Sequence, residues 1–274
     1  METNCPNYKF LYHYTSIDAL EKILKNKTIR FTRLDKVKGD PQEALSKEYP
    51  NASTFVFTSC WTDVSSENLP LWIIYTNLHG VRIKMPRCMF KGRHDNHKRT
   101  TNECHYRFNI DGEAYKIDAL HYQEDGTTNY QSLSSHFIYG PTHIKYVDVN
   151  SLSINNINFN SPIKYDFLSL GTIKASCWQF ENEVRFRLFA IVEDSLNDPY
   201  LEELLSPESL SRLVVETEYV DVALDSSVFD ELEILLAPEI TNEERSRVED
   251  ICRQYAPKAK ITPSSIKTTF NLKR

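Results

Sequence analysis

An alternating segment at 181–191 constrains the fold of this chain more than any other feature of its sequence. The segment interleaves four apolar with four charged side chains: Val184, Phe186, Leu188 and Ala190 alternate with Glu181, Glu183, Arg185 and Arg187. A period of two residues is typical of a half-buried β-strand. The segment therefore predicts a strand whose polar face meets water or a ligand.

The two carboxylates on that polar face are candidates for chemistry. Residues two apart on a strand lie about 7 Å from each other, so Glu181 and Glu183 could contact one substrate. Neighbouring anions repel each other, and Arg185 on the same face could neutralise one of them. A solvated face with cross-strand salt bridges is the alternative, and the pattern leaves both open.

The rest of the chain mixes strand and helix patterns. Strands are expected at 9–14, 54–60 and 81–85, and helices are expected after a cap at Thr15, from 70 to 77, and from a cap at Asn242 to Tyr255. With 274 residues, of which 41% are apolar, the chain can bury the core of one large domain or of two small ones. We expect an α+β fold in a single domain that spans 1–274.

No feature of the sequence indicates export or a membrane. The longest apolar runs are far shorter than the roughly 20 residues of a membrane-spanning helix, and Met1–Pro6 lacks the pattern of a signal peptide. The six cysteines are scattered, which suits reduced thiols better than a disulfide framework. We expect a cytoplasmic protein with no membrane contact.

Charge is concentrated in two regions of opposite sign. The formal net charge is −6, yet 82–107 holds eight Lys or Arg against two acidic residues, whereas 193–250 holds eighteen Asp or Glu against three Arg. A basic insertion at about 87–103 could contact nucleic acid through four cations, with a solvated loop as the alternative: Lys91, Arg93, Lys98 and Arg99. The cysteines and histidines nearby lack the paired spacing of a zinc site, so no metal is expected.

Familiar phosphate-loop and nucleophile motifs do not occur in the sequence, and seven glycines leave little scope for loops that approach phosphates closely. Kinase, dinucleotide-fold and hydrolase-triad interpretations are therefore excluded. His13 stands between aromatic residues at a predicted strand-to-helix junction, where free backbone N–H groups favour polar ligands; a hydrogen-bonded core histidine is the alternative. Trp72 and Tyr75 could stack on a ring or belong to the core.

A series of short motifs extends over nearly the whole chain. They are Y-H-Y-T-S at 12–16, T-I-R-F-T at 28–32, G-D-P-Q-E at 39–43, F-T-S-C-W at 57–61, L-W-I-I-Y at 71–75, G-V-R-I at 80–83, C-W-Q-F-E-N-E-V-R at 177–185 and L-E-I-L-L-A-P at 232–238. In order and spacing this series resembles a widespread bacterial family long described only as a domain of unknown function. That family is similar to the ADP-ribosyltransferase superfamily, and the W-x-x-E-x-E-x-R block carries the most specific part of the likeness.

The resemblance implies an ADP-ribosyltransferase-like split β-sheet core with flanking helices and a site that binds NAD as co-substrate. It implies these roles: His13 holds the adenosine-side ribose, the backbone at Tyr14 and Thr15 meets the nicotinamide amide, Arg33 contacts the pyrophosphate, and Tyr75 or Trp72 lies near the nicotinamide ring. Glu183 would form a hydrogen bond with a hydroxyl of the nicotinamide-side ribose, and Glu181 would orient the acceptor.

The function implied is mono-ADP-ribosylation of a macromolecule, as in a toxin or an anti-phage effector that an antitoxin or another partner could inhibit. The basic insertion slightly favours nucleic acid over protein as the acceptor. An NAD glycohydrolase, with water as acceptor, is one alternative. A module that binds a ligand or partner without catalysis is another.

Overall fold

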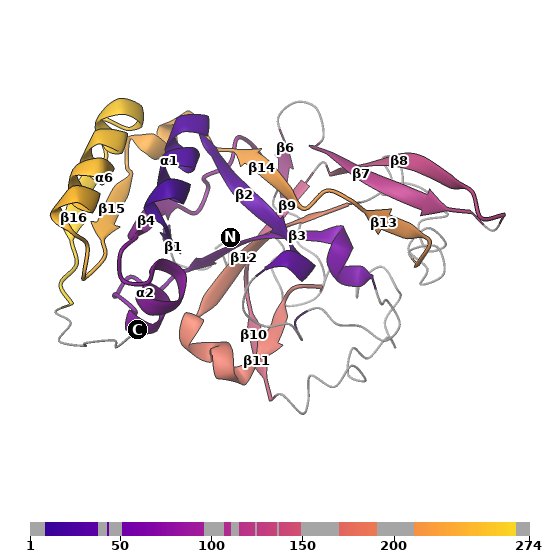
Figure 1. Ribbon diagram of the computed structural model, residues 1–274, viewed down its shortest axis with the longest axis horizontal. Coiled ribbons are helices and arrows are strands. Elements are labelled where there is room, and N and C mark those ends of the chain that lie inside the picture. Colours follow the sequence, from indigo (N-terminus) through magenta and orange to yellow (C-terminus); the bar gives the residue numbers. More distant parts are fainter. Residues whose placement is uncertain are drawn as a thin grey trace, which may run out of the picture.

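The computed structural model describes residues 9–37, 43, 51–95, 107–110, 115–123, 125–135, 137–148, 170–190 and 211–266. Within these residues the chain is a mixed α/β protein with one large curled sheet and few helices (Figure 1). This architecture is compatible with the predicted α+β class. No described helix is long and apolar enough to cross a membrane.

In the part of the chain that the structure describes, the large sheet has eleven strands. Its main path runs β16-β15-β4-β1-β3-β12-β9-β6-β5, and β2 branches from it because β2 pairs with both β3 and β14. The strands are β1 (Phe10–Thr15), β2 (Thr28–Arg33), β3 (Val56–Thr62), β4 (Val81–Pro86), β5 (Gly92–Asp95), β6 (Arg107–Ile110), β9 (Phe137–His143), β12 (Glu183–Phe189), β14 (Tyr219–Ala223), β15 (Glu233–Leu236) and β16 (Lys260–Pro263). The order makes β1, β3 and β12 neighbours, although β12 lies far from the other two in sequence.

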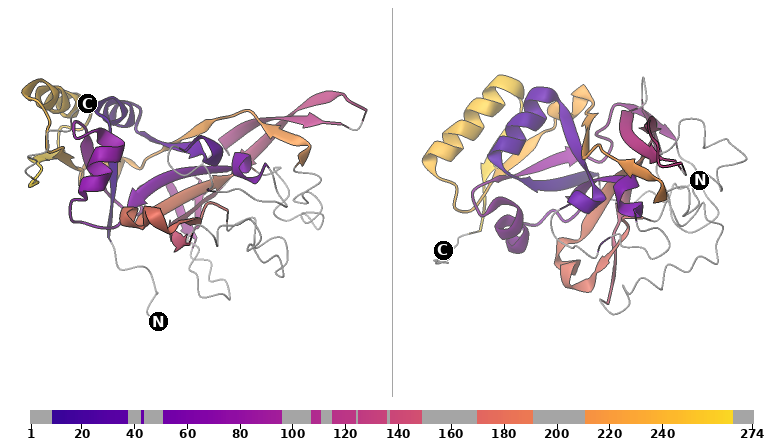
Figure 2. Two further views of the ribbon diagram at one scale, coloured as in Figure 1. Left: turned by 60° about the horizontal axis from the view of Figure 1, so that its bottom comes forward. Right: turned by 45° about the vertical axis from the view of Figure 1, so that its right-hand side comes forward.

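Helices gather at one end of the large sheet, and a smaller sheet projects from the other end (Figures 1 and 2). The helices among the described residues are α1 (Ile17–Asn26), α2 (Leu69–Thr76) and α6 (Asn242–Tyr255), and the smaller sheet holds β7 (Tyr115–Tyr122), β8 (Thr128–Ser135) and β13 (Leu213–Val215). α1 and α6 lie side by side, and Arg247 of α6 contacts Asp18 at 2.6 Å and Glu21 at 3.0 Å. A parallel pair, β10 (Lys145–Val147) and β11 (Ile173–Ala175), precedes the 3-10 helix η3 (Ser176–Glu181).

Local sequence signals set where α1 and α2 begin. The Ser16 hydroxyl accepts a hydrogen bond from the Ala19 N–H at 3.2 Å, and the Asn68 side chain accepts one from the Leu71 N–H at 3.2 Å. Both are N-caps, which satisfy backbone donors that a helix leaves free at its start. Gly80 then lets the chain after α2 pass close to β1, because a Cβ atom there would lie 2.3 Å from the Thr15 carbonyl oxygen.

The strand expected at 181–191 is shorter and more deeply buried than its alternation indicates. β12 covers Glu183–Phe189, Glu181 belongs to η3, and Asn182 joins them with a φ of 43°. β12 pairs with β3 on one side and β9 on the other, and all its residues are buried. The alternative of a solvated face with exposed salt bridges is therefore wrong, and contact of the polar face with a ligand stays a prediction. Both arginines have partners inside the protein, which makes their burial possible.

The basic insertion expected at about 87–103 is partly regular structure. Residues 92–95 form β5, which pairs antiparallel with β6, and the backbone of Arg93 lies opposite that of Asn109. Lys91, just before β5, is exposed. Lys98 and Arg99 lie outside the described residues, so the predicted basic surface is described only at its start.

Candidate active site

A pocket with about 370 Å³ of empty space, partly open to solvent, lies where β1, β3, β12 and α2 meet. Its lining is Tyr12, His13, Tyr14, Cys60, Trp61, Thr62, Leu71, Tyr75, Glu181 and Glu183. That space includes open solvent, and the enclosed cavity is about 70 Å³, well below the range of about 300–1,000 Å³ that is usual for small-molecule sites. The sequence named eight residues for the NAD site, and the structure brings five of them to this pocket: His13, Tyr14, Tyr75, Glu181 and Glu183.

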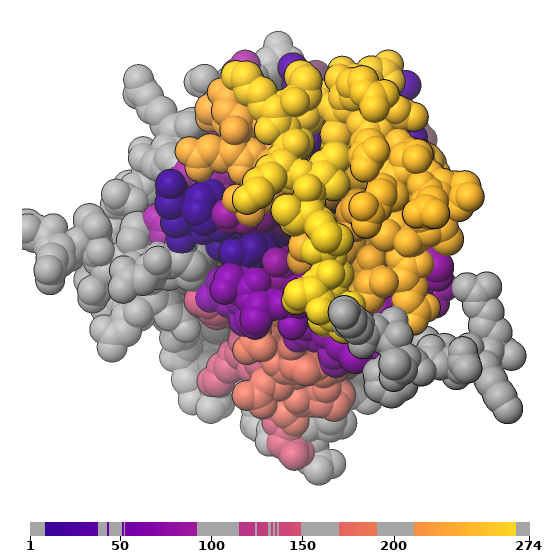
Figure 3. Space-filling model, turned by 90° about the vertical axis from the view of Figure 1, so that its left-hand side faces the viewer, coloured from indigo at the N-terminus to yellow at the C-terminus, as the bar shows by residue number. Residues whose placement is uncertain are grey.

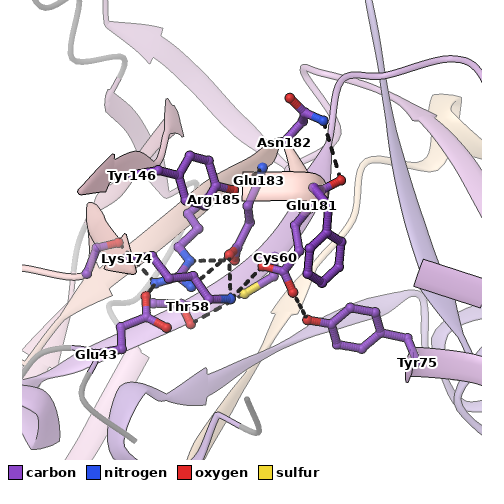
Figure 4. A network of polar contacts seen from close by, with 12 residues as sticks. Glu43, Thr58, Cys60, Tyr75, Tyr146, Lys174, Glu181, Asn182, Glu183 and Arg185 are labelled. Atoms are coloured by element: carbon purple, nitrogen blue, oxygen red, sulfur yellow. Dashed lines mark hydrogen bonds and ion pairs between the residues drawn. The ribbon is translucent and has the colours of Figure 1, made fainter. Parts of the chain in front are cut away.

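Glu183 is held by two buried cations at the start of β12 (Figure 4). Its Oε1 lies 2.5 Å from Arg185 Nε, and its Oε2 lies 2.9 Å from Arg185 Nη2 and 3.2 Å from Lys174 Nζ. Burial alone would raise the pKa of this carboxyl, but Arg185 and then Lys174 outweigh burial and lower the pKa to about 2. Glu183 is therefore an anion at neutral pH.

Glu181 reaches the same pocket from the last residue of η3. Its Oε2 lies 2.5 Å from Lys174 Nζ, and its Oε1 accepts a hydrogen bond from the Tyr75 hydroxyl at 2.5 Å. Burial raises the pKa of the Glu181 carboxyl, and the charge of Lys174 opposes this only in part. The two carboxylates are thus chemically distinct, because Glu181 holds a proton more readily than Glu183 does.

Arg185 links the pocket to the opposite side of the network. Its Nη1 donates to a carboxylate oxygen of Glu43 and, at 3.2 Å, to the Gly171 carbonyl oxygen. Burial raises the pKa of Glu43, and Arg185 opposes that shift. The Arg185 side chain is fully buried, so Glu183 and Glu43 supply the counter-charges that water cannot.

His13 is half-buried against the aromatic wall of the pocket. Its Nδ1 lies 2.8 Å from the Cys60 carbonyl oxygen, and its ring centroid is 5.1 Å from that of Trp61. Burial lowers the pKa of His13, and the bond to Cys60 opposes this. A neutral ring whose Nδ1–H donates to a carbonyl keeps Nε2 as an acceptor, which suits a sugar hydroxyl.

Glu67 fixes α2 to the end of the described chain. Its carboxylate accepts from Trp72 Nε1 at 3.1 Å, from Ser264 Oγ at 2.5 Å and from the Ser265 N–H at 2.7 Å. In Figure 3 the last described residues (yellow) accordingly reach α2 (purple), with 170–190 (salmon) beside it. Trp72 is fully buried and anchors the helix that presents Tyr75 to the pocket.

The other three residues named for the NAD site do not line the pocket. Trp72 packs edge-on against Tyr14, with ring centroids 4.8 Å apart, inside a small apolar cluster. Thr15 is buried beside Gly80. Arg33 is buried elsewhere and donates to Asp35 at 2.6 Å and to the carbonyl oxygens of Val215 and Thr217. The implied role of Arg33 at a pyrophosphate has no counterpart in this geometry, because its guanidinium is committed to these partners.

Four further residues complete the site and were not assigned roles from the sequence: Glu43, Cys60, Tyr146 and Lys174. The nearby Cys60 thiol helps to lower the pKa of Glu183, and burial raises the pKa of that thiol. The Tyr146 oxygen accepts from the Glu183 N–H at 2.8 Å. Glu43 and Cys60 lie inside motifs that carry the family resemblance, which is a signal for both. Lys174 lies in an ordinary polar stretch with no such signal.

A scan against protein-family models finds no match to this chain, and searches of curated proteins and of solved structures find none either. Fold and site together define a mixed α/β protein whose pocket combines aromatic side chains with two buried, unequal carboxylates. Within the described residues no group of His, Cys, Asp and Glu is arranged to hold a metal ion.

The low pKa of Glu183 predicts a contribution to folding that acid removes. The carboxyl has its ordinary pKa of 4.5 in the unfolded chain and about 2 in the folded protein, so the folded state binds fewer protons between these values. Its stabilisation is therefore complete above about pH 4.5 and is lost as the pH falls to about 2. Urea unfolding at successive pH values should show the stability difference between the wild type and Glu183→Gln shrinking over this window. A difference that does not change with pH would contradict the ion pair.

Proposed function

We propose that the protein is an NAD-dependent mono-ADP-ribosyltransferase that modifies a macromolecule, with nucleic acid favoured over protein, on an ADP-ribosyltransferase-like fold. One observation carries the proposal: five residues that the family resemblance names for NAD chemistry line a single pocket, although they come from β1, α2, η3 and β12. A series of solvated or purely structural side chains would have no reason to converge in this way.

The charges of the pocket suit cleavage of the bond between ribose C1′ and nicotinamide N1. As that bond breaks, its electron pair leaves with nicotinamide, and C1′ gains the positive charge of an oxocarbenium ion. Glu183 remains an anion at neutral pH because of its low pKa. A fixed anion beside the developing cation lowers the barrier, and burial strengthens the interaction because little water screens it.

Glu181 is suited to complete the transfer as the general base. A lone pair of the acceptor forms the new bond to C1′, and the proton of the acceptor passes to a Glu181 oxygen and then to water. Burial raises the pKa of Glu181, which makes it a better base than an ordinary carboxylate. Tyr75 donates a hydrogen bond to Glu181, and its side chain is 39% exposed. It lies at the edge of the pocket, where a nicotinamide ring could pack.

A second candidate is a module that binds a ligand or partner without catalysis. One observation favours it. Lys174 and Arg185 already contact three of the four carboxylate oxygens of Glu181 and Glu183, and the fourth accepts a hydrogen bond from Tyr75. In that case the cations would neutralise the carboxylates permanently, and the pocket would bind without cleaving.

Incubation with radiolabelled NAD and separate pools of RNA, DNA and protein distinguishes these functions. We expect nicotinamide release together with label on one polymer pool, most strongly on nucleic acid. Release with label on no polymer would replace the proposal by a glycohydrolase, and NAD binding without release would favour the binding module. Glu243→Gln, an exposed change on α6, is the matched control and should behave as the wild type.

A further inference from the structure

Both carboxylate oxygens of Glu181 already have partners inside the protein. Oε2 contacts the Lys174 ammonium at 2.5 Å, and Oε1 accepts from the neutral Tyr75 hydroxyl at 2.5 Å. Carboxylate oxygens have more than one lone pair, so each could still accept a hydrogen bond from an uncharged donor. A second cation at Glu181 would instead meet a positive charge already in place.

Lys174 is fixed in this position. It lies on β11, is 2% exposed and also contacts Glu183 at 3.2 Å. Its ammonium nitrogen is 4.8 Å from the centre of the Trp178 ring, which favours the cation further. Burial lowers the pKa of Lys174, but Glu183 and Glu181 outweigh it and raise the pKa, so the side chain stays charged. Displacing Lys174 would leave a buried charge without a partner, which is strongly unfavourable.

The carboxylates are not neutralised equally. Glu183 contacts both Lys174 and Arg185, Glu181 contacts only Lys174, and Glu43 contacts only Arg185, so within the described network three carboxylates share two cations. The network as a whole can therefore attract one further cation, the pyridinium of NAD or the ribosyl cation that follows it. Once that cation is bound, Glu181, whose Oε2 lies 2.5 Å from Lys174 Nζ, faces no unmatched negative charge.

Resting on the proposed function, we propose that the acceptor is an uncharged nucleophile, a hydroxyl, an amide or a nucleobase amine, and that Lys174 excludes guanidinium and ammonium acceptors from Glu181. An uncharged acceptor can donate its hydrogen bond to a free lone pair of Glu181 and lose its proton there during attack. A guanidinium would place a third positive charge beside Lys174 and the ribosyl cation, and like charges at close range strongly oppose binding.

Agmatine, a small guanidinium compound, tests the exclusion without any NAD turnover. The protein is labelled with ¹³C at glutamate carboxyls, and the Glu181 signal is identified by its loss in Glu181→Gln. We expect agmatine to leave this signal unchanged in the wild type and in Lys174→Arg, which keeps the charge. It should shift the signal in Lys174→Met, with binding at least about tenfold tighter than in the wild type. Lys174→Gln is the second variant in case Lys174→Met does not fold.

A Glu181 signal that agmatine shifts in the wild type overturns the inference. So does a folded Lys174→Met or Lys174→Gln that gains no binding. With NAD present, mass spectrometry should find ADP-ribosyl-agmatine only with these two variants and never with the wild type. Failure of the proposed function is a separate result, the absence of nicotinamide release by the wild type, and the agmatine titration still decides whether Lys174 excludes cations.

Discussion

Replacement of Glu183 by glutamine should lower the rate of nicotinamide release by about 10³-fold while NAD binding changes little. Glutamine keeps the shape of the side chain and removes the charge that the low pKa of Glu183 maintains at neutral pH. Preorganised charges that meet the developing charge of a transition state typically account for losses of about this size when they are removed. The rate is measured at saturating NAD, and binding is measured by calorimetry.

The comparison needs a control for folding, because Glu183→Gln also removes a partner of Arg185. Far-ultraviolet circular dichroism at the assay temperature verifies that the variant is folded, and Glu243→Gln should keep the wild-type rate. A folded Glu183→Gln with an unchanged rate would reject Glu183 as the stabilising carboxylate. Equal loss of rate and of NAD affinity would assign it to substrate binding instead.

Replacement of Arg185 by methionine should destabilise the protein by about 3–5 kcal/mol, the usual effect of removing one partner from a buried ion pair. Arg185 is fully buried, and its guanidinium contacts the carboxylates of Glu183 and Glu43. Methionine fills much of the same volume, so the loss would come from two carboxylates left without a counter-charge and from the vacated Gly171 carbonyl. Denaturant unfolding gives the change in the free energy of unfolding.

Arg30 supplies a matched control on the surface. Its guanidinium also makes two bonds to one carboxylate, at 2.8 and 2.9 Å to Asp221, but its side chain is 47% exposed. Exposed ion pairs contribute roughly 0–1 kcal/mol, so Arg30→Met should cost less than about 1 kcal/mol. An equal loss of stability in both variants would contradict the prediction that burial makes the Arg185 ion pairs contribute more to stability than an exposed ion pair does.

The sequence by itself determined the local elements and the residue types of the site. A period of two predicted the strand that became β12, and the prediction is confirmed from Glu183 to Phe189. The expected strands at 9–14, 54–60 and 81–85 correspond to β1, β3 and β4, and the expected helix after Pro70 to α2. These features follow from backbone geometry over a few residues, so adjacent residues suffice to reveal them.

Only the tertiary structure decided how the charges of the site are paired. The alternation of β12 indicated a polar face that meets water or a ligand, but the strand is buried between β3 and β9, and Glu43, 142 positions from Arg185, contacts the guanidinium in the interior. The turn at η3 brings Lys174 into contact with both Glu181 and Glu183. No local sequence pattern predicts this role for Lys174. Burial, pKa and ion pairing depend on contacts between segments distant in sequence, because each is set by the whole surroundings of a group and not by its neighbours along the chain.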